Sequence, residues 1–312
     1  MYELRQPAAA LAPYVDSYWF VHSTESDPVE LSVDVFVDGR ADLIFNFAAP
    51  YRRRVIGGKA REIAASNLDA QRLAPIRIEQ RGVVRTTGVR FRLGGLGAYA
   101  LTALADVTDR TPTPASVLGE DAVSLEAALR DEPDIDGQAK LLDAFFAGRV
   151  STAPGFATFQ RALAASVDSS GAASVAELAD AAGVSTRQID RLFARYLGFP
   201  PKVLGRVLRF QLALRRLMVD PEVTLAQLAI ECGYFDQAHF IKDFRRFSGG
   251  VPRGYRGYYP PQGPNDFAPN VVVFLQDDSE VESFTGDVEH RDSRQAPEDE
   301  DDEALVRQGD EG

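Results

Sequence analysis

Two sets of polar side chains have types and spacings suited to contact with the edges of DNA bases. They are Arg187, Asp190 and Arg191 in one segment, and Gln237, Lys242 and Arg245 in another, with His239 at the margin of the second set. Residues three and four apart share one face of a helix, so each set would project from one helix face. Arginine can bond both major-groove acceptors of guanine, and glutamine can bond both major-groove groups of adenine. A solvated helix face carries the same residue types, so the elements around the two sets decide between the interpretations.

Residues for catalysis or metal binding are scarce in the chain. Its single cysteine, Cys232, excludes an intramolecular disulfide and a zinc site built from several thiolates. Its three histidines, His22, His239 and His290, are widely separated. We therefore expect no catalytic residue, no cofactor and no metal. Cys232 is expected to be a small buried residue in the packing of a helix.

A duplication within residues 170–256 supplies elements that would position the two polar sets. Ser174 and Glu177 have the capping-box spacing that starts a helix, and Thr224 and Gln227 repeat it 50 residues later. Each predicted short helix carries an apolar stripe at helical spacing. The chain therefore contains two helix starts of the same kind.

Beyond each short helix, a glycine turn and a second amphipathic helix are predicted. The two turns are marked by Gly183 and Gly233. Apolar residues at i, i+4 and i+7 form the buried faces of the second helices: Ile189, Phe193 and Tyr196 in the first copy, and Phe240, Phe244 and Phe247 in the second. Residues 202–219 are expected to form a helix that joins the copies. This pattern is typical of two helix-turn-helix units, and it favours DNA contact for the polar faces opposite the apolar ones.

Charge is distributed unevenly along the chain, whose formal net charge is −12. Residues 1–155 carry −4, residues 156–260 carry +5, and residues 261–312 carry −13. A basic segment between acidic ones is typical of a nucleic-acid-binding module with an acidic appendage. We expect a sensing or dimerisation domain at 1–150, a DNA-binding domain at 156–260 and an acidic, largely disordered tail at 261–312. No apolar run is long enough for a membrane span, so we expect a cytoplasmic protein without membrane contact.

The first region is predicted to be rich in strands, with helices late. The predicted strands cover residues 31–37, 42–47, 53–56, 76–80 and 83–91. The first two are expected to form a hairpin around the turn signal Asp38-Gly39. Helical spacing follows Gly94-Gly95, and further helices are predicted at 125–129 and 139–146. The fold class is therefore an α+β first domain, with barrel-like or cupin-like strands before helices, and an all-α second domain.

Two shorter segments have their own predictions. Tyr14, Tyr18 and Trp19 are spaced like a helix-face or staple cluster and are expected in the core and not in a ligand cage. The apolar run at 271–275 fits either an edge strand of the first domain or packing on the second.

The second copy contains a dense sequence signature. Residues 233–240 read Gly-Tyr-Phe-Asp-Gln-Ala-His-Phe, and Phe244-Arg245-Arg246 and Gly249-x-x-Pro252-x-x-Tyr255 follow. This signature resembles that of the AraC/XylS family of bacterial transcription regulators, and the resemblance covers residues 156–259. It implies two helix-turn-helix units joined by one helix, with recognition helices in successive major grooves of double-stranded DNA.

The resemblance also implies roles for individual residues. Base contact is implied for Arg187, Gln188, Asp190, Arg191, Gln237, Ala238, His239 and Lys242. Phosphate contact is implied for Arg206, Arg209 and Arg245. Structural roles are implied for Gly183, Gly233, Phe240, Phe244, Gly249, Pro252 and Tyr255.

The first domain resembles the β-barrel-like sensor domain of one branch of that family. The matching segments are Leu11-x-Pro13-Tyr14-Val15 and Gly88-Val89-Arg90-Phe91, with Leu93 where the relatives carry proline. This resemblance implies a small-molecule effector in the first domain. RNA polymerase and a second copy of the chain are further partners that it leaves open. Control by a protein partner, autoinhibition by the acidic tail and sequence-tolerant DNA binding stay open as alternatives.

Overall fold

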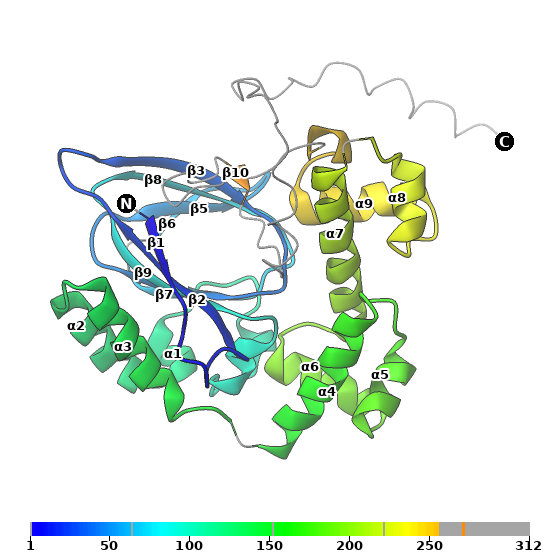
Figure 1. Ribbon diagram of the computed structural model, residues 1–312, viewed down its shortest axis with the longest axis horizontal. Coiled ribbons are helices and arrows are strands. Elements are labelled where there is room, and N and C mark those ends of the chain that lie inside the picture. The colour runs from blue at the N-terminus through cyan, green and yellow to red at the C-terminus, as the bar shows by residue number, and fades with distance from the viewer. Residues whose placement is uncertain (1, 64, 152, 221, 256–269, 272–312) are drawn as a thin grey trace. The chain divides into compact units, whose positions relative to one another are not determined.

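Most strands lie in the first third of the chain, and together with one short strand near residue 270 they pair into two sheets. The computed structural model describes residues 2–63, 65–151, 153–220, 222–255 and 270–271. The strands are β1 (Tyr2–Arg5), β2 (Val15–His22), β3 (Val29–Val35), β4 (Asp42–Asn46), β5 (Tyr51–Val55), β6 (Arg61–Ile63), β7 (Asn67–Asp69), β8 (Ile76–Gly82), β9 (Arg85–Phe91) and β10 (Asn270–Val271). One sheet has the order β1-β2-β9-β4-β7 and the other the order β10-β3-β8-β5-β6. Figure 1 shows them as two layers.

Three helices follow the strands and cover the sheet that contains β2 and β9 (Figure 1). They are α1 (Pro114–Leu118), α2 (Asp121–Asp131) and α3 (Ile135–Ala147). On α3, Phe146 packs edge-on against Phe91 of β9, with 5.7 Å between ring centroids. The Tyr18 hydroxyl of β2 donates a hydrogen bond to Asp143 of α3 at 2.9 Å. The predicted order of strands before helices is therefore confirmed.

The predicted hairpin around Asp38-Gly39 is wrong. Strand β3 pairs with β8, whereas β4 pairs with β7 and β9 in the other sheet. Alternating apolar residues assign a face to each strand but do not choose its partner. The connecting loop, residues 36–41, runs from one sheet to the other, and residues distant in the sequence hold it in place. Phe36 packs on Phe210, 6.5 Å between centroids, and Asp38 is bonded by Arg90.

Of the aromatic residues near the start of the chain, Tyr18 and Trp19 lie on β2 and Tyr14 lies in the turn before it, which corrects the predicted helix-face or staple cluster. Residues Val15–His22 form β2, and Tyr18 is buried in the core as expected. Trp19 lies opposite Gly88 of β9, where a Cβ atom would come within 1.8 Å of the indole ring. A glycine is required there by the close approach of the ring.

Two other predicted segments have different outcomes: the helix predicted after residue 95 is wrong, and the 271–275 run is only partly described. The helix expected after residue 95 is replaced by two short 3₁₀ turns, η1 (Gly95–Ala98) and η2 (Leu104–Asp106). Strand β10 pairs in parallel with β3, which agrees with an edge strand at the start of the 271–275 run. The rest of that run and the acidic tail lie outside the described residues.

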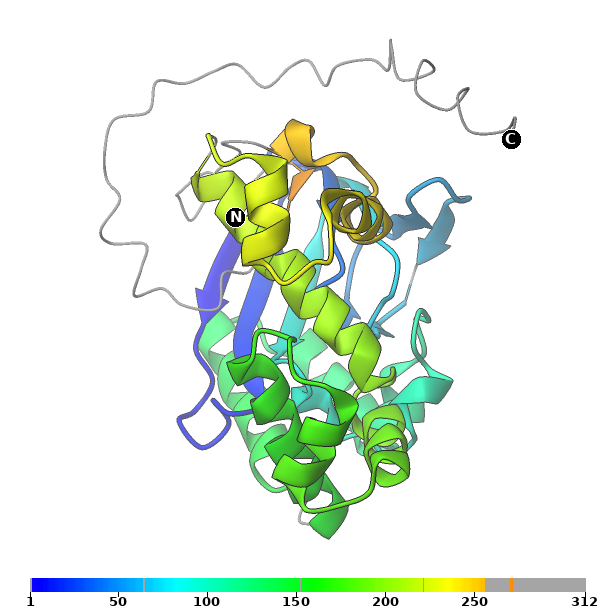
Figure 2. The same ribbon diagram turned by 90° about the vertical axis from the view of Figure 1, so that its right-hand side faces the viewer.

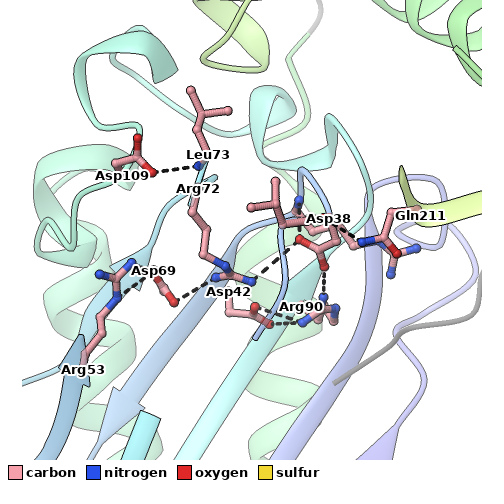
Figure 3. A network of polar contacts seen from close by, with 11 residues as sticks. Asp38, Asp42, Arg53, Asp69, Arg72, Leu73, Arg90, Asp109 and Gln211 are labelled. Atoms are coloured by element: carbon pink, nitrogen blue, oxygen red, sulfur yellow. Dashed lines mark hydrogen bonds and ion pairs between the residues drawn. The ribbon is translucent and has the colours of Figure 1, made fainter. Parts of the chain in front are cut away.

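A network of buried ion pairs links the two sheets (Figure 3). Asp69 on β7 accepts from Arg53 on β5 at 2.8 Å and from Arg72 at 2.9 Å. Arg90 on β9 bonds to Asp38 of the 36–41 loop. Burial opposes ionisation of Asp38, but the nearby cations, led by Arg90, outweigh it and hold the pKa of this carboxyl below its usual range. The loop is therefore anchored by charge inside the first domain.

The second domain is helical, as predicted. Its elements are α4 (Pro154–Asp168), α5 (Val175–Ala182), α6 (Thr186–Tyr196), α7 (Pro201–Val219), α8 (Leu225–Glu231), α9 (Gln237–Ser248) and the short 3₁₀ helix η3 (Pro252–Tyr255). Figures 1 and 2 show α7 running from the α4–α6 group to the α8–α9 pair. The predicted fold class, an α+β domain followed by an all-α domain, is confirmed.

The 36–41 loop also contacts the helical domain. The Val37 N–H donates to the Phe247 carbonyl of α9 at 3.1 Å, and the Gln211 amide of α7 donates to the Val37 carbonyl at 2.6 Å (Figure 3). Gly39 has φ +75°, and a Cβ atom there would come within 2.9 Å of Leu93. One loop thus bonds to the charged network on one side and to two helices of the helical domain, α7 and α9, on the other.

Candidate nucleic-acid interface

The first helix-turn-helix unit consists of α5 and α6. Ser174 and Glu177 form the predicted capping box: the Ser174 hydroxyl accepts from the Glu177 N–H at 3.3 Å, and the Glu177 carboxylate accepts from the Ser174 N–H at 2.7 Å. Gly183 ends α5 at φ +71°, a conformation that favours glycine. Ser185 then caps α6 by accepting from the Gln188 N–H. The predicted helices and turn of this unit are confirmed.

The second unit, α8 and α9, repeats this design with one difference at its start. Thr224 accepts from the Gln227 N–H at 3.2 Å, so the predicted helix start is confirmed. The Gln227 amide, however, donates to Glu231 at 2.8 Å and does not return to Thr224. A capping box needs the Gln227 side-chain oxygen to accept from the Thr224 N–H, and this side chain extends toward Glu231 instead, so the second capping box is only half formed. Gly233 at φ +72° follows, and Asp236 caps α9.

The apolar faces of α6 and α9 pack inward as predicted. The buried residues are Ile189, Phe193 and Tyr196 on α6, and Phe240, Phe244 and Phe247 on α9. Phe210 of α7 lies 5.3 Å from Phe244 and 5.5 Å from Phe247, between ring centroids. The signature residues after α9 close the unit: Gly249 ends the helix at φ +79°, Pro252 is buried, and Tyr255 packs on Phe244.

The opposite faces of α6 and α9 expose the side chains predicted to reach bases. These are Arg187, Gln188, Asp190 and Arg191 on α6, and Gln237, Ala238 and Lys242 on α9. His239 differs from them, because its side chain is 41 % exposed and its ring packs against Tyr234 at 5.4 Å. Its Nε2 lies 3.8 Å from the Asp243 carboxylate. The structure thus gathers each predicted set on one surface, with His239 at the edge.

The three arginines predicted to bind phosphate have different surroundings. Arg206 on α7 donates to Asp243 through Nε at 3.0 Å and also through Nη2. Arg209 donates from Nη1 to the Gly171 carbonyl at 2.9 Å. Arg245 is exposed on α9. Arg206 and Arg209 therefore each use part of the guanidinium group on a partner inside the domain, which leaves only their remaining N–H groups for phosphate contact.

Asp243 is a residue of α9 that the sequence patterns did not single out. Its side chain is 1 % exposed, and its hydrogen bonds to Arg206 raise the pKa of that guanidinium. The pair ties the recognition helix α9 to α7. The available signal was an acid between Phe240 and Phe244, on the face where an apolar residue is expected.

Cys232 follows α8 and is buried, as predicted. Burial raises the pKa of its thiol to about 11, so little thiolate forms at neutral pH. In the described ranges, no group of three His, Cys, Asp or Glu residues could hold a metal ion. No helix within the same ranges is long and apolar enough to cross a bilayer.

Two family models match separate parts of the chain. A helix-turn-helix domain matches residues 178–258, which include α6 to α9. A domain of unknown function (DUF6597) matches residues 3–113, which include both sheets of the first domain up to β9.

Known transcription regulators are similar to part of the chain. The HTH-type transcriptional regulator GbdR of Pseudomonas aeruginosa (strain UCBPP-PA14) is 34 % identical over 84 residues, 27 % of this chain and 23 % of GbdR. The HTH-type transcriptional regulator ArgR of Pseudomonas aeruginosa is 32 % identical over 77 residues, 25 % of this chain and 23 % of ArgR. The chain thus aligns with less than a quarter of the length of these relatives. A solved AraC-type transcriptional regulator from Chromobacterium violaceum is 26 % identical with TM-score 0.31, over 34 % of this chain and 95 % of that one.

Proposed function

We propose that this chain, which belongs to the AraC/XylS family through its paired helix-turn-helix units, is a sequence-specific DNA-binding transcription regulator. The observation that carries this proposal is the exposure, on both α6 and α9, of polar residues able to bond to base edges. One such face would be an ordinary helix surface. Two faces on duplicated units at the ends of one connecting helix favour recognition of two adjacent grooves.

In this proposal the two exposed faces read two base blocks about one helical turn, ~34 Å, apart. Helix α6 contributes Arg187, Gln188, Asp190 and Arg191, and helix α9 contributes Gln237, Ala238, His239 and Lys242. Arg245 binds phosphate and sets the register of α9. Arg206 acts indirectly, because it holds α9 on α7 through Asp243.

Substitution of one base-reading residue in each unit tests this proposal. Arg187→Ala and Gln237→Ala should each weaken binding to a cognate duplex by about 1–3 kcal/mol and change binding to random DNA little. Arg81→Ala, which removes an exposed arginine of the first domain, should leave both affinities unchanged. Fluorescence anisotropy at one fixed salt concentration measures all of them, because DNA affinity depends steeply on salt. Equal losses on cognate and random duplexes would refute base reading by these residues.

The first domain is proposed to control this DNA contact. Near the first unit, Arg195 of α6 donates to the carbonyls of Ala100, at 3.0 Å, and Thr102. Near the second, Val37 is bonded to Phe247 of α9. An effector that shifts the first domain would therefore move the two reading faces relative to each other.

A loop variant tests whether the first domain positions the reading faces. Phe36 packs on Phe210 of α7 and on Tyr255, so Phe36→Ala should loosen the attachment of the 36–41 loop to the second unit. The variant should alter affinity for a duplex with both base blocks at least threefold and leave affinity for a single block unchanged. Val55→Ala, at an exposed position on β5, is the control. Unchanged affinity of Phe36→Ala for both duplexes would refute this coupling.

We propose that a small-molecule effector or a protein partner acts on the first domain. A small molecule in the first domain and a protein partner are distinguished by whether a metabolite alone raises the melting temperature of the full chain. RNA polymerase and a second copy of the chain are further proposed partners. Sedimentation of the full chain over a range of concentrations tests the second copy, and sedimentation with added RNA polymerase tests the polymerase.

A further inference from the structure

Phe235 is an exposed aromatic residue beside the recognition helix of the second unit. Its side chain is 91 % exposed, whereas the other phenylalanines that the structure describes are buried or half-buried. A single exposed apolar residue is ordinary on a folded domain, and what distinguishes Phe235 is its position beside the recognition helix.

A comparison of the two units shows that Phe235 is an added residue. In the first unit, a single residue, Val184, separates the turn glycine from the N-cap of α6. In the second, both Tyr234 and Phe235 separate the glycine from Asp236, the N-cap of α9. The turn of the second unit is therefore one residue longer.

Backbone bonds identify which residue is the extra one. The Val184 N–H donates to the Ala179 carbonyl at 3.0 Å, and the Tyr234 N–H donates to the Ala229 carbonyl at 2.9 Å. The two residues therefore occupy the same place in their turns, and both side chains turn toward the interior. Phe235 has no counterpart in the first unit.

The added residue lies where a recognition helix approaches DNA. It directly precedes the N-cap of α9, and the first two residues of that helix, Gln237 and Ala238, are exposed. In helix-turn-helix proteins, the N-terminal residues of the recognition helix contact base edges. The apolar group that a major groove offers to a side chain is the 5-methyl group of thymine. Glutamine in turn recognises adenine, the base that pairs with thymine.

We propose that Phe235 contacts a thymine methyl group in the base block read by α9 and so determines specificity at that position. This inference rests on the proposed function, since it requires α9 to lie in a major groove. It gives the second unit an apolar reading residue that the first unit does not have.

Replacement of thymine by uracil tests the contact, because it removes only the methyl group. The full chain is bound to its selected duplex, with thymine or with uracil in the α9 block. The wild type should bind the uracil duplex about fourfold more weakly, the factor expected for one buried methyl group. Phe235→Ala should weaken binding to the thymine duplex by a similar factor and show no further loss with uracil. Phe235→Leu should retain part of the discrimination.

Ile230→Ala is the matched control, because Ile230 is a second exposed apolar residue, 74 % exposed, on α8 of the same unit. It should discriminate between the duplexes as the wild type does, and equal melting temperatures should show that all variants are folded. If Phe235→Ala still discriminated thymine from uracil, or bound like the wild type, the inference would be overturned. A full chain that selects no duplex at all would overturn the proposed function as well, which separates the two failures.

Discussion

Removal of Arg206 should destabilise the second helix-turn-helix unit, because it leaves the carboxylate of Asp243 buried without its partner. Loss of one member of a fully buried ion pair costs about 3–5 kcal/mol. The Asp243 side chain is 1 % exposed, but that of Arg206 is 28 % exposed, so water reaches part of the pair. With that screening, Arg206→Ala should lower the free energy of unfolding by about 2–4 kcal/mol.

Two comparisons isolate the buried pair in urea unfolding followed by circular dichroism. Arg216→Ala breaks an ion pair between α7 and Glu231 of α8, but these side chains are 51 % and 38 % exposed, so the loss should stay below about 1 kcal/mol. The double variant Arg206→Met/Asp243→Leu removes both charges and should recover most of the stability lost in Arg206→Ala.

The same variant distinguishes a positioning role from phosphate contact. A lost phosphate contact would lower the slope of log K against log salt by about 1. We expect an unchanged slope for Arg206→Ala, because its guanidinium group is bonded to Asp243. A stable Arg206→Ala protein with a slope reduced by about 1 would refute the reasoning and restore Arg206 as a phosphate ligand.

Three further predictions follow from the backbone and from burial. Gly183→Ala should lower stability by about 1–2 kcal/mol, because φ is +71° there, whereas Gly148→Ala at φ −90° should be neutral in the same thermal melts. Burial raises the pKa of Cys232 to about 11, so its alkylation by iodoacetamide at pH 8 should be much slower in the native protein than in urea, and equal rates would contradict burial. Burial and then Arg85 lower the pKa of His22, so the unfolded state binds more protons as the pH falls below about 6.5 and stability declines there. His22→Gln should flatten this decline in melting temperature, and an unchanged profile would assign the decline to other groups.

The helical domain could be predicted from sequence because its signals are local. Ser174 and Thr224 start helices, Gly183 and Gly233 end them, and the i, i+4, i+7 apolar positions of α6 and α9 define the buried faces. Each signal depends on residues within a few positions, so no long-range partner had to be known. The gathering of each polar set on one surface follows directly from those faces.

The strand partners could not be predicted, because they depend on residues distant in sequence. β3 and β4 are separated by the 36–41 loop, whose Asp38 is bonded by Arg90 and whose Phe36 packs on Phe210. Alternation on the strands carries no information on those contacts. Asp243 is the same case in the site, since its burial depends on Arg206, 37 residues earlier.

Phe235 could be predicted only in part from the sequence. The longer second turn is visible in the sequence, since the turn glycines are 50 residues apart and the N-caps Ser185 and Asp236 are 51 apart. Exposure of the side chain depends on which of two aromatic residues packs inward. In the folded unit the N–H of Tyr234 bonds to the Ala229 carbonyl and its side chain is buried, whereas that of Phe235 is exposed.

Selection of genomic DNA fragments by the full chain tests the central claim most directly. Two reading faces on duplicated units predict one enriched motif with two short base blocks about one helical turn apart, roughly 10 base pairs. Binding without an enriched motif, with the same affinity for every duplex and a steep dependence on salt, would show sequence-tolerant binding and contradict the account.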